Sequence, residues 1–226
     1  MTAIDLATIT LKGGSHAKAE DGVCLLEATA LMAGEPLSDH PKCVSPVLGA
    51  FGRAWNDGMR SDAEREQLKQ YIPLLIGTAG DIAADERRSW LAIDWLVRVA
   101  TPTWLRLAGL TDHADKLTAL HPITNTTYAE MARDAAWDAR AAAGAARDAA
   151  QDAAGDATRA AAVATRAAQA TQAAQAAQAV AWAAQAAWVA WVGAGTTAGD
   201  ALELAALQAS AHDLFMRMIR VEEEPQ

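Results

Sequence analysis

Residues 132–153 read ARDAAWDARAAAGAARDAAQDA, and this run lies inside a longer stretch, Tyr128 to Val192, that consists mainly of alanine. Alanine is the strongest helix former, but its side chain buries little apolar area, so helices made of it must pack very closely. Alanine occupies each a and d position of a heptad pattern here, at Ala132, Ala135, Ala139, Ala142, Ala146, Ala149 and Ala153. The pattern predicts antiparallel helices about 8 Å apart.

The heptad pattern changes register at Gly155, where Asp156 takes the expected d position. This change predicts a helix end or a local change of winding. A single helix over the whole alanine-rich stretch would be about 100 Å long, so two or three helices folded back on one another are expected. Trp182, Trp188 and Trp191 supply the bulk that alanine lacks. They either close the bundle or form the anchor of an interface, and they are the candidate interface residues.

The charge of the chain excludes some partners. The 226 residues carry a formal net charge of −9, and no Lys or Arg falls between Arg166 and Arg217. Binding to a nucleic-acid backbone needs clustered Lys and Arg, so no such partner is expected. The last quarter also lacks the cationic face that attracts anionic lipid, and no membrane partner is expected. A protein partner or self-association remains.

The segment most like a membrane span is Ala179 to Ala194, but Gln185 interrupts it and it is mostly alanine. A buried helix explains it better. The first residues do not form a secretory signal, because no basic region precedes a continuous apolar core. With only two cysteines, a reduced, cytoplasmic protein is expected.

The chain changes composition near the His121-Pro122 step, before which it uses the full range of amino acids and after which alanine dominates. This change predicts a helical domain of mixed composition over 1–122. It also predicts an alanine-rich helical hairpin or bundle over 123–226, which ends in an amphipathic helix. The fold class is therefore all-α, with a short extended or hairpin segment at residues 3–12.

Capping residues and helix breakers predict the helices of the first part. The first expected helix is 23–32, with Asp21 as its N-cap. A second is opened by Ser45-Pro46 and stops at Asn56-Asp57-Gly58, and a third is opened by Ser61 and Glu64 and ends before Pro73. An amphipathic helix follows over 83–99, and then two short helices over 104–107 and 111–120 that Gly109 separates. The last amphipathic helix of the chain should bury Leu204, Leu207, Ala211, Leu214 and Met218.

Both cysteines and two of the five histidines fall within residues 16–43, and this set admits four interpretations. The first is a zinc site made of His16, Cys24, His40 and Cys43, since tetrahedral zinc takes two thiolates and two imidazoles. The spacing of His40 and Cys43 suits one ligand pair, but the spacing of His16 and Cys24 is not that of a standard knuckle. Zinc is the one cofactor that the sequence indicates.

The second interpretation is a cysteine nucleophile. With Asp21 as the N-cap, Cys24 lies in the first helical turn, where free amide groups favour a thiolate. His40 or His16 would act as the base, and Asp39 or Glu27 would orient it.

The third interpretation is a disulfide between Cys24 and Cys43, which a reducing compartment disfavours. In the fourth, both thiols are buried as small apolar groups, and the neighbouring His, Asp and Glu side chains make structural hydrogen bonds; this interpretation carries the most weight. His113, His121 and His212 stand alone in the sequence, and no phosphate-binding loop or metalloprotease motif is present.

The stretch from His16 to about Leu120 resembles a group of uncharacterised proteins from actinobacteria and their phages. The residues that carry the resemblance are Asp21-Gly-Val-Cys-Leu-Leu-Glu-Ala28, Ala33-Gly-Glu-Pro36, Asp39-His-Pro-Lys-Cys-Val-Ser-Pro46, Trp55-Asn56-Asp57 and Asp94-Trp95-Leu96-Val97-Arg98. The alanine-rich half resembles, in composition only, the variable helical repeats attached to such domains. The resemblance implies a bacterial or phage cytosolic setting, and it transfers no activity and no catalytic residue.

The sequence therefore favours a non-catalytic interaction or assembly module, whose helical second half presents a surface to a partner or to its own copy. The alternative is a zinc-binding protein or a cysteine-dependent enzyme centred on Cys24, with His40 as its second catalytic candidate.

Overall fold

The computed structural model describes residues 8–59, 61–107, 109–129, 132 and 198–222. All regular structure in these ranges is helical, so the predicted all-α fold is confirmed. The elements, in chain order, are η1 (Ala19–Asp21), α1 (Leu25–Met32), α2 (Pro46–Gly58), α3 (Asp62–Arg65), η2 (Glu66–Tyr71), α4 (Ile72–Leu75), α5 (Ile82–Trp95), η3 (Leu96–Ala100), α6 (Thr101–Leu107), α7 (Thr111–Thr118), α11 (Ala198–Ile219) and η4 (Arg220–Glu222).

Helix α2 starts and stops where its sequence predicts. Ser45 is its N-cap and accepts the Leu48 N–H, and Pro46 follows in the first turn, where its missing N–H costs nothing. The helix ends at Gly58, which confirms the predicted stop at Asn56-Asp57-Gly58.

The segment after α2 begins as predicted and then continues in further helical elements. Ser61 caps α3 as expected, because its Oγ accepts the Glu64 N–H at 3.2 Å. This helix ends at Arg65, before Pro73 as predicted. Residues 66–71 continue as the 3-10 helix η2, and α4 begins at Ile72 with Pro73 in its first turn. Proline is tolerated there because the first N–H groups of a helix have no partner within that helix.

The predicted amphipathic helix over 83–99 is present, but it is longer than expected. Helix α5, the π-helical segment η3 and α6 form one continuous run from Ile82 to Leu107, whereas a separate helix was expected at 104–107. Pro102 explains the π-helical segment, because a proline ring clashes with the carbonyl four residues earlier and the wider turn makes room for it. Gly109 ends the run in a left-handed conformation, φ 75°, as predicted.

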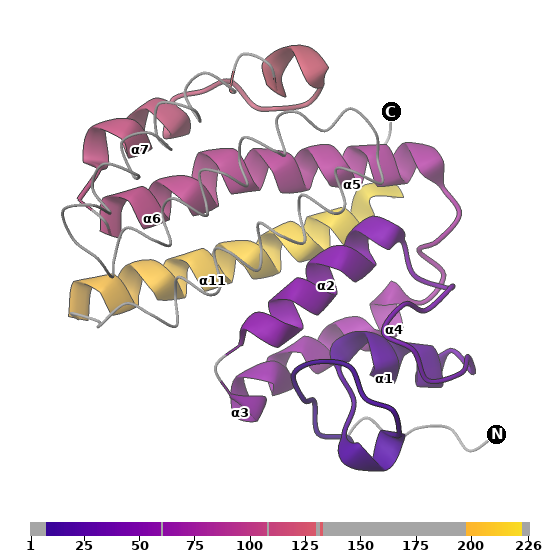
Figure 1. Cartoon of the computed structure of the whole chain (residues 1–226). Coiled ribbons are helices and arrows are strands. Elements are labelled where there is room, and N and C mark those ends of the chain that lie inside the picture. Colours follow the sequence, from indigo (N-terminus) through magenta and orange to yellow (C-terminus); the bar gives the residue numbers. More distant parts are fainter. Residues whose placement is uncertain (1–7, 60, 108, 130–131, 133–197, 223–226) are drawn as a thin grey trace.

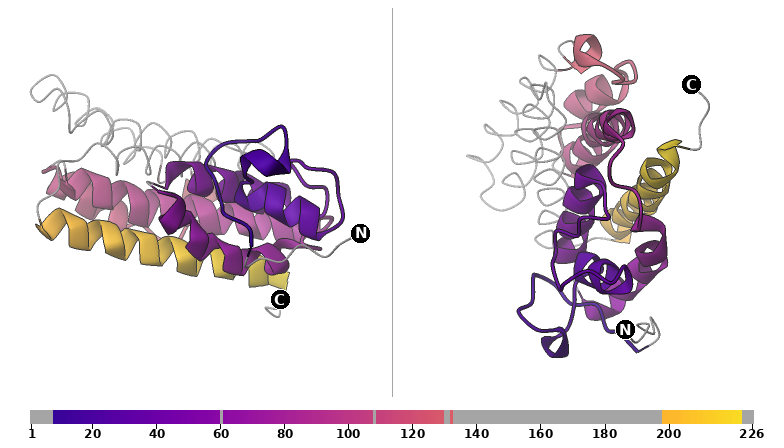
Figure 2. Two further views of the ribbon diagram at one scale, coloured as in Figure 1. Left: turned by 90° about the horizontal axis from the view of Figure 1, so that it is seen from below. Right: turned by 90° about the vertical axis from the view of Figure 1, so that its right-hand side faces the viewer.

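The core joins α11 to the first part of the chain. Figures 1 and 2 show α11 side by side with α5 and α6, and it also contacts α2. Phe215 of α11 stacks on Phe51 with ring centroids 5.4 Å apart and meets Trp55 and Tyr71 edge to face. The expected buried face of this helix is confirmed, since Leu204, Leu207, Ala211, Leu214 and Met218 are all buried.

Gly52 permits the close approach of three helices in this core. A Cβ atom added at Gly52 would lie 3.1 Å from Leu26 and 3.2 Å from Leu25 of α1, and 3.5 Å from Phe215 of α11. A larger side chain at Gly52 would require the side chains of Leu25 and Leu26 to shift.

His212 belongs to the same core and does not stand alone, although the sequence showed it as an isolated residue. Its Nδ1 lies 2.6 Å from the Tyr71 hydroxyl and its Nε2 lies 2.9 Å from Gln67 Oε1. Burial lowers the pKa of His212. The neutral imidazole is therefore a packed part of the α11 interface.

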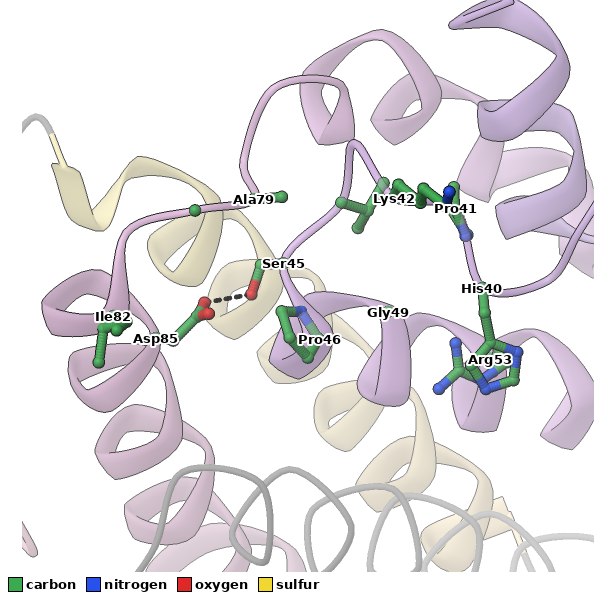
Figure 3. Close-up of a pocket in the computed structure, with 12 residues that line it drawn as sticks. His40, Pro41, Lys42, Ser45, Pro46, Gly49, Arg53, Ala79, Ile82 and Asp85 are labelled. Carbon is green, nitrogen blue, oxygen red and sulfur yellow. Dashed lines mark hydrogen bonds between the residues drawn. The ribbon is translucent and has the colours of Figure 1, made fainter. Parts of the chain in front are cut away.

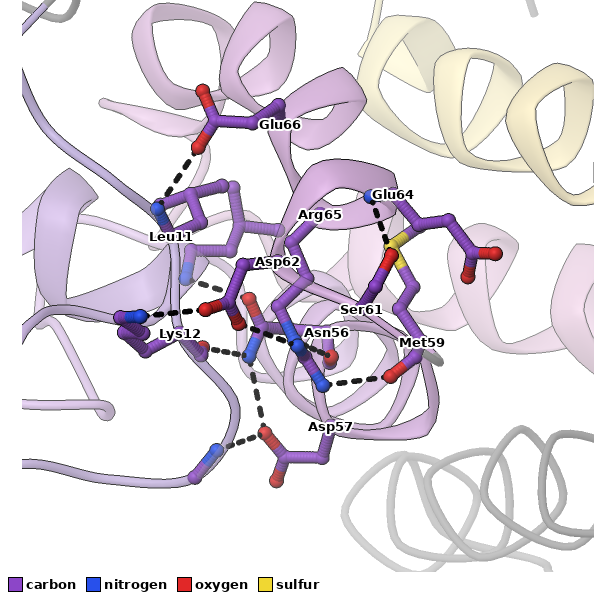
Figure 4. Close-up of polar contacts among 12 residues, drawn as sticks. Leu11, Lys12, Asn56, Asp57, Met59, Ser61, Asp62, Glu64, Arg65 and Glu66 are labelled. Carbon is purple, nitrogen blue, oxygen red and sulfur yellow. Dashed lines mark hydrogen bonds and ion pairs between the residues drawn. The ribbon is translucent and has the colours of Figure 1, made fainter. Parts of the chain in front are cut away.

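A polar network fastens the N-terminal segment to α2 and α3 (Figure 4). Arg65 is its centre and donates to the carbonyls of Asn56 and Met59 at 2.9 and 2.6 Å. The Asn56 side chain donates to the Lys12 carbonyl at 2.8 Å, and Lys12 pairs with Asp62 at 2.5 Å. These contacts satisfy carbonyls at the end of α2 and hold residues 11–14 in place.

The extended segment expected at 3–12 is reduced to a single bridge in the described residues. Leu11 pairs with Val23 in an isolated parallel β-bridge, and the Lys12 N–H donates to the Val23 carbonyl at 2.9 Å. Residues 3–7 of that expectation lie outside the described ranges.

The alanine positions beyond Ala132, the register change at Gly155 and the three late tryptophans also lie outside the described residues. Ala132 itself is buried, and so is Ile123, which follows the predicted boundary. The Ile123 N–H donates to Asp94 of α5 at 2.7 Å. The division into two domains stays a prediction. In the part of the chain that the structure describes, no helix is long and apolar enough to cross a membrane.

Candidate functional site

Cys24 is itself the N-cap of α1. Its Sγ accepts the Glu27 N–H at 3.4 Å, and Glu27 Oε2 accepts the Cys24 N–H at 2.7 Å, which makes a reciprocal capping box. The predicted N-cap, Asp21, is wrong, because Asp21 lies exposed in the short turn η1. The reciprocal bonds between Cys24 and Glu27 place the N-cap three residues after Asp21.

Glu27 also binds His16, so three groups form one cluster, which we name the Cys24 cap: His16, Cys24 and Glu27. Glu27 Oε1 accepts the His16 backbone N–H at 2.5 Å, and its Oε2 lies 2.8 Å from His16 Nδ1. Glu27 is only 1% exposed. A buried carboxylate is stable when several donors satisfy it, and this one receives three.

The Cys24 thiol is held in its neutral form. Cys24 is 2% exposed, and burial raises the pKa of the thiol to about 12, with the negative charge of Glu27 acting in the same direction. Nucleophilic cysteines need a thiolate near neutral pH. The thiolate expected from the first helical turn is therefore not favoured, because desolvation outweighs the backbone hydrogen bonds that lower the pKa.

The four predicted zinc ligands do not gather. His16 and Cys24 meet through Glu27, whereas His40 is exposed and its Nδ1 lies 2.8 Å from Asp39. Across the described ranges, no three His, Cys, Asp or Glu side chains are placed to hold a metal ion together. Both Cys24 and Cys43 are free thiols, so the disulfide of the third interpretation is not formed.

The loop that carries His40 and Cys43 is fixed by Glu35. The Glu35 carboxylate accepts the backbone N–H groups of Lys42 at 2.7 Å and Cys43 at 2.8 Å, and these bonds lower its pKa. The Cys43 carbonyl in turn accepts the N–H groups of Gly77 and Ala79. The loop is thereby held between the end of α1 and the segment that leads into α5.

This loop forms one wall of a cleft, which we name the Arg53 cleft (Figure 3). Its walls are the loop 40–45, the face of α2 that carries Pro46, Gly49 and Arg53, and the segment 79–85 at the start of α5. The cleft encloses about 530 Å³. That volume lies in the range of pockets that bind small ligands or single side chains.

One end of the cleft is cationic. Arg53 is half-buried and donates through Nη1 to the Asp39 carbonyl at 2.8 Å, and His40 lies beside it in Figure 3. Burial lowers the pKa of Arg53, while the more distant charges of Asp39 and Asp57 oppose that shift. In the described part of the chain, neither Arg53 nor Lys42 forms an ion pair with a carboxylate, although both line the cleft.

The other end of the cleft is closed by a satisfied acid. Asp85 accepts a short hydrogen bond from Ser45 Oγ and a bond of 2.9 Å from Arg88 Nη1. Arg88 is fully buried and also donates to the carbonyls of Thr78 and Met218. This network joins α2, α5 and the end of α11, so it is part of the scaffold.

Comparison with family models, with curated proteins and with solved structures found no match to this chain. The function is therefore inferred from the arrangement of the chain's own residues.

The sequence singled out one residue of the loop that lines this cleft, and it did not single out the other charged groups of the cleft. His40 was singled out, while Arg53, Lys42 and Asp85, which define the two ends of the cleft, were not. One signal was available: Gly49 and Arg53 lie four residues apart in a correctly predicted helix, so they share a face. The approach of residues 79–85 to that face depends on tertiary packing. The interface candidates Trp182, Trp188 and Trp191 lie outside the described residues.

Proposed function

We propose that this protein is a non-catalytic interaction module that binds a segment of a partner protein in the Arg53 cleft. The observation that supports it is the pairing of apolar walls with two cations, Arg53 and Lys42, neither of which forms an ion pair with a carboxylate of the described chain. Arg53 is half-buried, so its unused donors are costly to leave without a partner and gain most from a ligand of opposite charge. We place the module in a bacterial or phage cytoplasm, in keeping with the resemblance of its first half.

The rim of the cleft adds apolar contact area. Ile82 is 82% exposed at the start of α5, and Pro46 is exposed on α2. Both residues line the cleft. Ile82 lies at the Asp85 end of the cleft (Figure 3), so a segment that spans the cleft would combine an apolar contact at this end with polar contacts at the Arg53 end.

The enzyme alternative centred on Cys24 lacks support from the geometry. Cys24 is buried with a raised pKa, and the hydrogen bonds of Glu27 are directed to the backbone and to His16. Cys24, Glu27 and His16 therefore form a helix cap. None of these three residues lines the Arg53 cleft.

The proposal is tested by selecting short peptides from a displayed random library on the full chain. The informative variant is Ile82→Asp, since the side chain is exposed and an acidic residue in the first turn suits a helix. The matched control is Leu202→Asp, which changes another exposed aliphatic residue, 74% exposed on α11. We expect selected peptides to bind wild type and the control equally and to bind Ile82→Asp about tenfold more weakly.

Peptides whose binding is indifferent to Ile82→Asp, or a failure to select any, would contradict the proposal. A second copy of the chain is the other occupant to examine. Light scattering across a concentration series on wild type and Ile82→Asp decides this point: a dimer that dissociates in the variant makes the cleft a self-association site instead.

A further inference from the structure

We infer that the Arg53 cleft recognises a carboxylate joined to an aliphatic residue, with the carboxylate at the Arg53 end and the aliphatic group against Pro46 and Gly49 in the middle of the cleft. This inference rests on the proposed function, and it adds the chemistry of the recognised group and its direction in the cleft.

Arg53 supplies the first reason. Its guanidinium has five N–H donors, and the described contacts use one of them, the Nη1 bond to the Asp39 carbonyl. That bond orients the guanidinium. Because the planar fork of arginine matches the two oxygens of a carboxylate, the remaining donors fit this ligand better than a single neutral acceptor.

Acidic groups also act on the cations at this end of the cleft, so Arg53 selects its ligand through its hydrogen-bond donors. The negative charges of Asp39 and Asp57 act on Arg53, and Glu35 acts on Lys42. Asp39 Oδ1 lies 2.8 Å from His40 Nδ1, and in the described residues none of these carboxylates forms an ion pair with Arg53 or Lys42. The unused N–H donors of Arg53 therefore remain available to an incoming carboxylate.

The opposite end gives the ligand its direction. Asp85 carries a negative charge, and Ser45 and Arg88 already satisfy it. A ligand carboxylate placed there would meet a like charge and find the donors in use. The apolar residues of the walls lie between the two ends, as Figure 3 shows for Pro46 and Gly49. An aliphatic group therefore fits in the middle, with its acid pointing to Arg53.

Gly49 keeps the space beside Arg53 open. A Cβ atom added at Gly49 would lie 3.3 Å from Arg53 Nη1, which is a tight contact with the tip of a flexible side chain. The position has an ordinary helical backbone, so alanine can be accommodated in the helix. Gly49→Ala is thus a variant that narrows the cationic end without breaking the fold.

The test compares N-acetyl-leucine with N-acetyl-leucinamide, which differ only in the carboxylate. Both are titrated into the full chain, and binding is followed by the backbone amide chemical shifts of Gly49, Ala79 and Gly80. We expect saturable shifts for both probes, with the acid binding at least fivefold more tightly than the amide. Raising the salt concentration should reduce that ratio, since the preference is electrostatic.

Variants assign the preference to the cleft. Arg53→Gln and Gly49→Ala should bring the ratio between the two probes close to one. The matched control is Arg106→Gln, because Arg106 pairs with Asp115 on another face and does not line the cleft. Equal binding of the acid and the amide to wild type would overturn the inference, and so would a preference that survives in Arg53→Gln.

Two peptide sources of the carboxylate are then separated. One peptide ends in leucine with a free C-terminus, and the other has a leucine next to an internal aspartate and an amidated end. The tighter binder identifies a chain terminus or an acidic side chain as the recognised group.

Failure of this inference can be distinguished from failure of the proposed function. Peptides that depend on Ile82 but ignore Arg53→Gln leave the module without carboxylate recognition. Binding of N-acetyl-leucine that depends on Arg53, without any Ile82-dependent peptide, leaves a small-molecule site and no protein partner.

Discussion

The Cys24 cap and the Arg53 cleft each contain a histidine and an acidic side chain, yet they differ in what their charged groups contact. In the cap, the Glu27 carboxylate is 1% exposed and receives three hydrogen bonds from the chain itself. In the cleft, Arg53 is half-buried and uses one of its donors. A buried charge that its own chain satisfies stabilises the fold, whereas a half-buried charge with free donors is available to a ligand.

The two regions are also linked through α1. The cap fixes the beginning of this helix, and Glu35, just beyond its end, fixes the loop that forms one wall of the cleft. A substitution in the Cys24 cap should therefore weaken ligand binding in the cleft only by lowering the stability of the whole domain. Changes at the Arg53 end of the cleft should leave the stability of the domain nearly unchanged, whereas changes at its closed end, where Ser45 and Asp85 belong to the scaffold, should not. The predictions that follow test this difference.

The largest effect is expected from Glu27→Ala. It removes the acceptor of three hydrogen bonds and leaves the Cys24 N–H and the His16 side chain without a partner. The loss of one member of a buried polar cluster costs about 3–5 kcal/mol. Urea unfolding followed by circular dichroism measures this cost. Glu20→Ala, at an exposed position in η1, is the control and should change stability by less than about 0.5 kcal/mol.

A smaller effect is expected from Ser45→Ala at the closed end of the cleft. Ser45 caps α2 and donates to Asp85, so its removal leaves an N–H without its cap and weakens the contact between α2 and α5. N-cap removal costs about 1–2 kcal/mol. The same urea experiment on Ser61→Ala gives the comparison, because Ser61 caps the short helix α3 at an exposed position. A cost for Ser45→Ala no greater than that for Ser61→Ala would mean that the Asp85 contact does not hold these helices together.

Much of the local structure was predictable from the sequence. The caps Ser45 and Ser61, the stop at Gly109 and the apolar face of α11 are properties of neighbouring residues, and all were predictable. The π-helical segment before Pro102 and the place of His212 were not. They depend on how α6 continues from α5 and on where α11 lies against Tyr71.

The candidate site was predictable only in part, for the same reason. A Cys or His in the sequence shows its reactivity only once its burial is known, and Cys24 turned out to be 2% exposed. Arg53 and Asp85 lie 32 positions apart in the chain, and only the packing of α2 against α5 makes them two ends of one cleft. Local pattern locates the loop at His40, and long-range contacts decide what the loop encloses.

An effect of about 1 kcal/mol is expected from the Cys24 thiol at alkaline pH. Its pKa in the folded chain is raised from the ordinary value of 9.0 to about 12. Above pH 9 the thiol ionises in the unfolded chain but stays neutral in the folded chain. The free energy of unfolding therefore falls as the pH rises above 9, and it is unaffected below that pH. Wild type should therefore lose about 1 kcal/mol between pH 8 and pH 10 relative to Cys24→Ser, which keeps an N-cap but does not titrate.

The matched control for that experiment is Cys43→Ser, because Cys43 is only half-buried. Cys43→Ser should lose nearly as much free energy of unfolding between pH 8 and pH 10 as wild type does. The range stops at pH 10 because Tyr71, whose pKa burial raises to about 12, begins to contribute beyond it. Equal slopes for wild type and Cys24→Ser would show that the thiol is more exposed to water than the cap requires.

The smallest effect is expected from Arg53→Gln, and it bears most directly on the comparison. Arg53 has no ion pair in the described chain, and the cost of its burial offsets its hydrogen bond to Asp39. Its replacement should change the free energy of unfolding by about 0.5 kcal/mol or less. Arg65→Gln is the matched arginine, because Arg65 is 9% exposed and donates to Asn56, Met59 and Asp62, so its loss should cost about 2–3 kcal/mol. If Arg53→Gln costs as much as Arg65→Gln, then Arg53 holds the fold together and is not free for a ligand. A small cost for Arg53 beside a large cost for Arg65 separates an arginine kept for binding from one used for structure.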